Sequence, residues 1–597
     1  MTVHEVLIQY EDRLRHLQAG IEQIRLPHIL AATVLVIALA VFLALSLCAI
    51  RGQVSVLWLF LPMTGAVAST RRLQKNHQSR SRMRRLSRFY NRAVQRVKGN
   101  WTGSKTTGES FGDADHVHAR DLTIFGEGSL FELLCIARTS IGRRGLANYL
   151  VEAPALEETL LRQEAVRELC ERVDLREKIA TLGESDSAES KWNTFEDWLS
   201  SPTLAFSRYI PLVAAITSGL LAGLILAGYS VAIPWSRVAV AICTLMVFHA
   251  GIGLFFRDRV KTMIDWVHPV WLETRVLREG LDLLARQRFQ SVKLRRLVDR
   301  AQNSSAAIRK LERLLDALAQ RDKDWFYHLS RLLLAGTQLC IAIEQWRAVH
   351  GRALKIWLEV WAEFEALNAL AGYGYENPEN TFPELSNGDA CFEARELGHP
   401  LLPRMSCVVN DVALGKTSCF YVISGSNMSG KSTLLRAIGL NAVLAFAGAP
   451  VRARALRLSG LSIFASLSIV DSLLNGKSKF LAEVDRLRLA IEATAGKKPV
   501  LFLVDEIFSG TNSRDRRIAA EAVVRTLISR GAIGVLSTHD LALTEIADAE
   551  GMRGANLHMG SRDGRDPMDF DYQLKPGITN EANALAIARM AGVPVGG

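Results

Sequence analysis

The sequence predicts an α/β domain at the C-terminal end of the chain, preceded by an all-α region that contains two apolar helical hairpins. Strand-like and helical runs alternate after residue 376, as in domains built on a parallel sheet. Apolar residues recur every three or four positions in 101–208 and 257–375, which is the spacing of amphipathic helices. Two pairs of long apolar runs lie at 28–70 and 209–256. A chain of 597 residues has room for all of these parts.

The long apolar runs have the length of membrane-spanning helices. His28 to Ile50 carries no charged side chain, and a short link joins it to Val54 to Thr70. Tyr209 to Trp235 and Val238 to Phe256 form a second pair. Apolar runs of about 20 residues are transmembrane candidates, so each pair is predicted to be a transmembrane hairpin. Buried core helices of a soluble domain are the alternative, and Pro62 makes the second run the weakest of the four.

A basic segment follows the first hairpin. Residues 71–100 contain eleven Lys or Arg and no acidic residue, which largely accounts for the formal net charge of +11. The positive-inside rule places such a segment in the cytoplasm, and an even number of spans then puts both termini there. We therefore expect a multi-pass protein of a bacterial-type inner membrane. The segment is expected to lie beside anionic membrane lipid, and a nucleic-acid patch is the alternative. Eight scattered cysteines without a C-x-x-C pair indicate a reducing compartment and no structural metal.

The segment Ser424 to Thr433 contains the pattern G-x-x-x-x-G-K-[ST]. An apolar run, Cys419 to Ile423, precedes it as a predicted strand, and Leu434 to Leu440 follows as a predicted helix. Backbone N–H groups of such a loop surround phosphate oxygens at the helix N-terminus. Lys431 is expected at the β- and γ-phosphates of ATP, and the Ser432 hydroxyl on Mg²⁺. The predicted phosphate cradle consists of Gly425, Ser426, Asn427, Met428, Ser429, Gly430, Lys431, Ser432 and Thr433.

Further residues of a nucleotide site follow this phosphate-binding loop (P-loop, Ser424 to Thr433) along the chain. The apolar strand Pro499 to Val504 ends in Asp505 and Glu506. In this position an Asp holds Mg²⁺ and the adjacent Glu polarises the attacking water. A later strand, Ala532 to Thr538, ends in His539, which is placed to sense the γ-phosphate. Gly476 and Ser478 lie at a predicted helix N-terminus that suits a phosphate.

These motifs resemble the ATPase domain of the MutS mismatch-repair family. The matching segments are Gly425–Thr433, Gly476–Glu483, Asp505–Asn512, Ser537–His539 and the terminal Asn583–Pro594, while Arg138–Leu150, Ala153-Pro154 and Arg162–Val166 resemble the start of the family's helical core. The resemblance implies an ABC-class ATPase in which two copies sandwich two ATP molecules. Ser478 would then contact the γ-phosphate bound by the other subunit. It also implies a homodimer that hydrolyses Mg-ATP and acts on DNA.

The chain departs from the family pattern in several places. Mismatch-reading members begin with a DNA-reading domain and a connector, where this chain has a hairpin and a basic segment. Phe125 to Glu127 matches the mismatch-reading Phe-x-Glu but stands at the entry to the helical core, so we take the match as coincidence. Cys407 occupies the position of an aromatic residue that stacks on adenine in family members. The pattern is most similar to a membrane-anchored MutS-related subgroup that lacks the mismatch-reading domain.

The expected function is that of a membrane-anchored, dimeric, MutS-like ATPase coupled to DNA without mismatch readout. A membrane ATPase acting on a protein or lipid partner is the alternative. An ABC transporter is disfavoured, because four spans make a poor translocation path and the Leu-Ser-Gly-Gly-Gln signature is absent. The predicted domains are a cytoplasmic arm (1–27), hairpin 1 (28–70), the basic segment (71–100), the first part of the helical core (101–208), hairpin 2 (209–256), the core and lever helices (257–375) and the ATPase domain (376–597).

Overall fold

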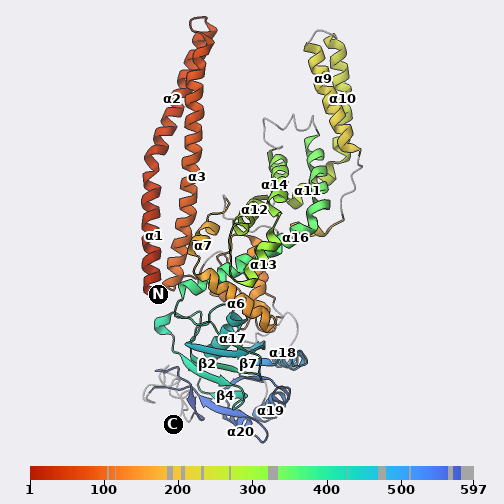
Figure 1. Cartoon of the computed structure of the whole chain (residues 1–597). Coiled ribbons are helices and arrows are strands. Elements are labelled where there is room, and N and C mark those ends of the chain that lie inside the picture. The colour runs from red at the N-terminus through yellow and green to blue at the C-terminus, as the bar shows by residue number, and fades with distance from the viewer. Residues whose placement is uncertain are drawn as a thin grey trace, which may run out of the picture. The chain divides into compact units, whose positions relative to one another are not determined.

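The chain forms two compact units in a computed structural model (Figure 1). Unit 1 comprises Met1–Ile136, Leu146–Thr181 and Leu367–Gly597, and unit 2 comprises Ala137–Gly145 and Leu182–Ala366. The structure describes residues 1–103, 106–113, 116–183, 192–202, 209–229, 234–267, 271–320, 334–426, 428–467, 479–509, 512–562 and 569–579.

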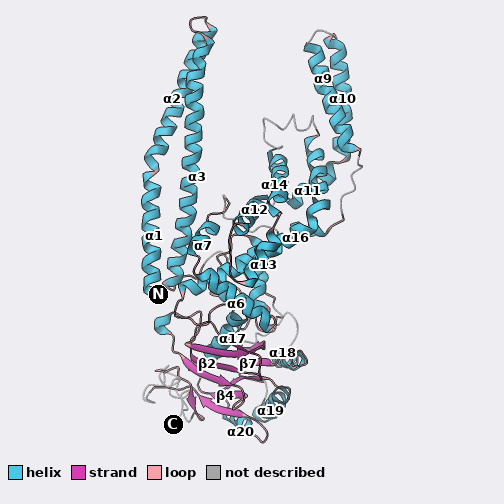
Figure 2. Cartoon of the chain, in the orientation of Figure 1, coloured by secondary structure: helices cyan, strands magenta, loops and turns pink. Residues whose placement is uncertain are grey.

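The C-terminal part of unit 1 contains the described strands (Figure 2). The larger sheet has the order β10-β9-β4-β8-β7-β6, and only β10 pairs antiparallel in it. Its strands are β4 (Phe420–Ser424), β6 (Ser462–Ser466), β7 (Val500–Asp505), β8 (Ile533–Thr538), β9 (Gly554–His558) and β10 (Lys575–Pro576). The smaller sheet has the order β1-β5-β2-β3, with β1 (Glu384–Ser386), β2 (Phe392–Leu397), β3 (Asn410–Leu414) and β5 (Ala455–Ser459).

Helices surround the larger sheet, as expected for an α/β domain. They are α17 (Lys431–Ala447), α18 (Lys479–Ala493), α19 (Ser513–Ser529) and α20 (Glu545–Asp548), with the short helices η4 (Arg404–Ser406) and η6 (Leu541–Thr544) in connecting loops. Every residue of β4 and β8 is buried. Continuous apolar burial is the pattern of strands covered on both faces, so the predicted α/β fold of this part is confirmed.

The first three helices of unit 1 form a long antiparallel hairpin (Figure 1). These are α1 (Val3–Gln23), α2 (Arg25–Ile50) and α3 (Phe60–Val97), with η1 (Val56–Leu59) before α3. A Cβ atom at Gly65 would lie 3.9 Å from Ala38 Cβ, and one at Gly20 would lie 3.3 Å from Met83 Sδ. Both pairs fit one register, in which Lys75 of α3 lies level with His28 of α2.

The predicted second apolar run is divided between η1 and the start of α3. Pro62 falls in the first turn of α3, where a missing N–H removes no intrahelical hydrogen bond, so the proline does not interrupt a helix. The basic segment is not a separate stretch of chain, because it continues α3 to Val97. Among the residues that the structure describes, two helical stretches are long and apolar enough to cross a membrane: Val3–Ile50, which joins α1 and α2, and Trp235–Phe255.

The foot of this hairpin is buried in unit 1. Tyr10 of α1 and Tyr90 of α3 pack edge to face, with ring centroids 5.3 Å apart, in a cluster with Val6. Arg96 of α3 binds the Glu376 carboxylate through Nε at 2.8 Å and Nη2 at 2.6 Å. Glu376 ends the helix α16 (Ala335–Glu376), which runs from unit 2 into unit 1. The first hairpin is therefore fixed to the end of the helix that leads into the C-terminal α/β domain.

Part of the segment expected in the helical core packs against the C-terminal α/β domain. Asp121 Oδ1 accepts a hydrogen bond from the Leu467 N–H at 2.9 Å, and its other carboxylate oxygen pairs with Arg486. Leu122 is fully buried and contacts α17 at Gly439, where a Cβ would lie 2.5 Å from Leu122 Cδ2. Phe125 packs on Phe131 at 5.7 Å between ring centroids. The nearby elements of unit 1 are η2 (Glu109–Phe111), α4 (Leu130–Leu134), α6 (Leu156–Cys170) and α7 (Val173–Ala180).

The described elements of unit 2 are helices, as predicted for the core and lever region. They are α8 (Trp192–Ser200), α9 (Ile210–Tyr229), α10 (Trp235–Phe255), α11 (Arg257–Val267), α12 (Trp271–Ala285), α13 (Val292–Ala301) and α14 (Ser304–Gln320), while α5 (Ser140–Val151) begins in unit 2 and ends in unit 1. Trp361 of α16 is fully buried and covers Gly280 of α12 so closely that a Cβ would lie 2.3 Å from the ring. The helices α9 and α10 run side by side (Figure 1).

Candidate functional site

Three loops of the C-terminal α/β domain meet at one edge of its larger sheet. Ser424 ends β4 and pairs with Thr538 of β8, while Asp505 ends β7 and pairs with Ser537. Because neighbouring parallel strands end at the same edge, the P-loop after β4, the acidic turn after β7 and His539 after β8 lie close together. The predicted strand-end motifs are thus brought to one site.

The P-loop needs glycine at two positions for steric reasons. Gly425 has φ +152°, and a Cβ there would lie 2.3 Å from the Met559 carbonyl oxygen. Gly430 has φ +100°, and a Cβ there would lie 3.0 Å from Cδ1 of Tyr572. The helix α17 begins directly afterwards at Lys431, so the N–H groups of its first turn have no intrahelical acceptor and face an anion site.

The Lys431 side chain folds back onto the P-loop. Its side chain is buried, and Nζ donates to the carbonyl oxygens of Gly425 and Ser426, both at 2.8 Å. Burial lowers the pKa of Lys431, and the carboxylates of Asp505 and Glu506 act in the opposite direction. The ammonium group is therefore held at the phosphate cradle and faces two carboxylates.

The residues predicted to hold magnesium contact one another directly. The Ser432 hydroxyl donates to Oδ2 of Asp505, and the Ser537 hydroxyl donates to Oδ1. Hydroxyl and carboxylate oxygens are hard donors that suit Mg²⁺, which usually takes its remaining ligands from phosphate and water. The Ser426 and Ser429 hydroxyls are buried and have no hydrogen-bond partner within the described part of the chain. These unpartnered hydroxyls line a cradle that fits the oxygens of a magnesium-bound triphosphate.

Glu506 and His539 form a pair on the solvent side of the Asp505 cluster. Glu506 Oε1 lies 3.2 Å from His539 Nδ1, and the two side chains are 35% and 49% exposed. Glu506 has φ +52°, and its N–H donates to the Ser537 carbonyl at 3.0 Å. A carboxylate beside an imidazole and open to water is the geometry of a general base with an orienting partner.

Of the remaining predicted site residues, some are exposed or hydrogen-bonded, and two lie outside the described part of the chain. Met428 has φ +74° and is 70% exposed, and Thr433 is exposed on the first turn of α17. Asn427 and Ser478 lie outside the described residues. The sulfur of Cys407 accepts a hydrogen bond from the His399 N–H at 3.3 Å.

Sequence reasoning missed Tyr572, whose ring lies against the P-loop at Gly430. Asn410 of β3 holds this segment through a hydrogen bond from Nδ2 to the Tyr572 carbonyl at 3.0 Å and one from the Leu574 N–H at 2.7 Å. The Tyr572 side chain is 44% exposed. No local motif marks it, and the only sequence signal is the aromatic pair Phe570 and Tyr572 in a polar segment.

Comparison with known proteins agrees with this site. The family model for MutS domain V matches residues 421–596. A DNA mismatch repair protein MutS of Lactobacillus delbrueckii subsp. bulgaricus is 29% identical over 244 residues, covering 40% of this chain and 28% of the relative. One of Exiguobacterium sp. is 35% identical over 204 residues, covering 33% and 24%. An Endonuclease MutS2 of Thermomicrobium roseum is 29% identical over 297 residues, covering 49% and 34%.

In each of these three matches the chain therefore covers no more than about a third of the relative's length. The family match begins one residue inside β4 and contains the P-loop, β7 with Asp505 and Glu506, and β8 with His539. Residues 421–596 therefore belong to the MutS domain V family, as an α/β domain of ATPase type that follows a helical region.

Proposed function

We propose that the chain is a Mg²⁺-dependent ATP hydrolase. The observation that carries this proposal is the meeting of Lys431, the Ser432–Asp505 contact and the Glu506–His539 pair at one sheet edge. Lys431 and the first-turn N–H groups of α17 bind the phosphates. Ser432 and Asp505 would hold Mg²⁺, which would supply charge neutralisation at the transferred phosphoryl group. Glu506 accepts the proton of the attacking water, and His539 fixes the orientation of that carboxylate.

Steady-state turnover of the full chain tests this assignment. Glu506→Gln keeps the shape of the side chain but removes its basicity, so turnover should fall by about 10²- to 10⁴-fold. The matched control is Glu521→Gln, which changes a partly exposed glutamate of α19 that pairs with Arg525 four residues further along. Wild-type turnover in the Glu506→Gln protein would remove Glu506 from the role of base.

We also infer that two copies of the chain form the complete site, with Ser478 of one subunit at the γ-phosphate held by the other. This rests on the resemblance, because Ser478 lies outside the described residues. Analytical ultracentrifugation of the Glu506→Gln protein should show dimers that increase with ATP and fall with ADP. An ATP-independent monomer at micromolar concentration would rule out the sandwich.

We further propose that the first hairpin anchors the chain in a membrane. Large apolar side chains of α2 are exposed along its length, among them Val36 at 66%, Leu43 at 64% and Ile50 at 83%. Residues 31–50 of α2 span about 30 Å as a helix, the thickness of a bilayer's hydrocarbon core. Exposed lipid-facing side chains argue against buried core helices of a soluble domain, which was the alternative for this run.

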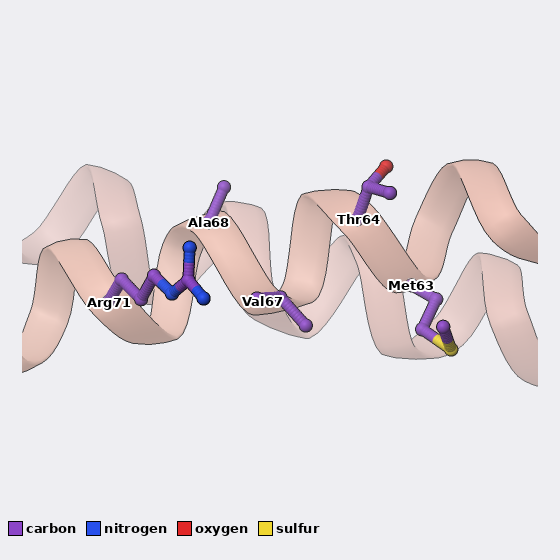
Figure 3. A pocket seen from close by; sticks show the side chains of 5 residues that line it. All are labelled: Met63, Thr64, Val67, Ala68 and Arg71. Atoms are coloured by element: carbon purple, nitrogen blue, oxygen red, sulfur yellow. The ribbon is translucent and has the colours of Figure 1, made fainter.

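The cations of α3 are placed for such an anchor. Figure 3 shows one face of α3, on which Met63 and Val67 are followed by Arg71, and Thr64 by Ala68; these five residues line a shallow surface groove. In the register given above, Arg71 and Lys75 lie level with the start of the apolar part of α2. The rest of α3, from Lys75 to Val97, extends about 33 Å further, which exceeds a Debye length of about 8 Å. Only the first few cations therefore reach lipid headgroups.

Alkaline extraction of membranes that contain the full chain tests the anchor. The protein should remain in the membrane pellet, and a cysteine placed at Arg51, at the tip of the hairpin, should react with an impermeant reagent added from the outer side. Release into the alkaline supernatant would contradict the anchor. Labelling of Arg51→Cys only from the cytoplasmic side would contradict the orientation.

DNA is the proposed partner, because the relatives are named for DNA mismatch repair and for endonuclease action. A polyanion bound by several cations shows a steep slope of log affinity against log salt concentration. We expect such a slope for duplex DNA and the detergent-solubilised chain, with an affinity that depends on nucleotide. Absence of DNA binding at low salt would favour the second candidate, an ATPase that acts on a protein or lipid partner.

A further inference from the structure

The turn that follows the Asp505 strand has an unusual backbone. Glu506 has φ +52° and Phe508 has φ +53°, so two residues with side chains adopt the left-handed conformation on either side of Ile507. Such conformations are disfavoured for residues other than glycine and persist where the surroundings hold them in place. Contacts with neighbouring residues are therefore expected to hold this turn, which carries the proposed catalytic base Glu506.

Both the N–H and the carbonyl group of Phe508 are hydrogen-bonded to side chains. Its N–H donates to the carboxylate of Glu483, and its carbonyl oxygen accepts from Nε of Arg516 at 3.0 Å. The next carbonyl, of Ser509, accepts from Nη2 of the same guanidinium at 3.1 Å. The Phe508 side chain is buried, with its ring centroid 5.9 Å from that of Phe480.

The two side chains that bind Phe508, those of Glu483 and Arg516, come from different helices and are both largely buried. Glu483 lies on α18 and is 1% exposed. Arg516 lies on α19, and its Nη1 is 3.6 Å from Oδ2 of Asp540, with side chains that are 12% and 17% exposed. Asp540 directly follows His539. The guanidinium therefore joins the turn that carries Glu506 to the segment that carries its imidazole partner.

We propose that Glu483 and Arg516 are positioning residues that clamp the left-handed turn, so that the Glu506 carboxylate stays beside His539. This inference rests on the proposed ATP hydrolysis and adds two residues that never touch the nucleotide in this role. Loss of the hydrogen bonds from either side chain allows the backbone of the turn to relax toward the right-handed region. The resulting rotation at Phe508 moves the Glu506 carboxylate relative to the attacking water. The clamp's hydrogen bonds end on the turn, whereas P-loop atoms make the phosphate cradle, so nucleotide affinity should persist.

The test compares Glu483→Ala and Arg516→Ala with a matched control, Glu132→Ala. Glu132 is also a buried carboxylate of unit 1 that accepts a backbone N–H, from Gly128 at 2.7 Å, but it lies on α4. For both clamp variants kcat should fall by about 10- to 100-fold, the cost of a misplacement of about 1 Å, while the nucleotide Kd stays within about two-fold. Glu483→Gln keeps an acceptor oxygen and should recover most of the rate.

Hydrogen exchange of the peptide covering 505–509 supplies a readout that needs no turnover. Exchange should accelerate in both alanine variants and stay unchanged in Glu132→Ala. A wild-type chain without turnover would overturn the proposed ATPase function, and the exchange rates would then still decide whether the clamp exists. Unchanged exchange in the clamp variants, or an equal loss of kcat in the control, would overturn the clamp.

Discussion

Replacing Gly425 by alanine should abolish tight nucleotide binding without unfolding the domain. The new Cβ would lie 2.3 Å from the Met559 carbonyl oxygen, whereas ordinary contacts between carbon and oxygen are about 3.3 Å or longer. The loop must therefore move by about 1 Å at the residue whose carbonyl accepts from Lys431 Nζ. We take as the scale the loss of about 10²-fold that a misplacement of about 1 Å can cause in a reaction rate. Applied to the affinity, this is about 2.7 kcal/mol at 1.36 kcal/mol per tenfold change.

The assay is equilibrium binding of a fluorescent ATP analogue to the detergent-solubilised full chain. Gly531→Ala is the matched control, since Gly531 has φ +80° but nothing lies within 4 Å of a Cβ there. That control has the backbone strain without the clash, so its affinity should remain within about two-fold while its stability falls by about 1 kcal/mol. Equal affinities for Gly425→Ala and the wild type would refute the steric reasoning.

Three more outcomes follow from the same site and its surroundings. Ser432→Ala removes a hydroxyl from Asp505 and should raise the Mg²⁺ concentration needed for half-maximal turnover by about ten-fold, as a Mg²⁺ titration would show; an unchanged titration would contradict the metal role. We expect the partly exposed Tyr572 ring, which lies against the P-loop at Gly430, to stack on the base of ATP. Base stacking on an aromatic ring contributes about 1–3 kcal/mol, so Tyr572→Ala should weaken ATP binding by about ten-fold and Tyr572→Phe should not. Equal affinities of the wild type and Tyr572→Ala would exclude stacking. Burial lowers the pKa of His118 to about 3, so the folded state favours the neutral ring. The free energy of unfolding should therefore fall as the pH drops below about 6.5, by at most 1.36 kcal/mol per pH unit. His118→Gln should flatten that slope when stability is measured by urea unfolding at several pH values.

The ATPase domain could be predicted from sequence because its signals are local. Strands β4 and β7 are short apolar runs that are buried along almost their whole length, and each ends directly in a motif. Adjacent parallel strands end at one edge, so the chemistry at the ends of three strands had to converge. The meeting of Lys431, Asp505, Glu506 and His539 then follows from the strand order β4-β8-β7, which the structure supplies.

Other features depend on contacts between distant segments, which sequence periodicity does not report. Residues 116–124 carry no signal that Leu122 packs on Gly439 of α17. Tyr572 reaches the P-loop across more than a hundred residues of chain, and Glu483 reaches Phe508 across twenty-five positions. The left-handed backbone at Glu506 and Phe508 was equally hidden, since neither residue type favours it.

The most direct test of the central claim is to identify the nucleotide that stays bound after incubation with Mg-ATP. Wild-type and Glu506→Gln proteins would be separated from free nucleotide, denatured and analysed for ATP and ADP. If Glu506 is the base, the wild-type chain should carry mostly ADP and the variant mostly ATP, in equal total amounts. ADP on both proteins would show that Glu506 is not the base, and no nucleotide on either would contradict the nucleotide site itself.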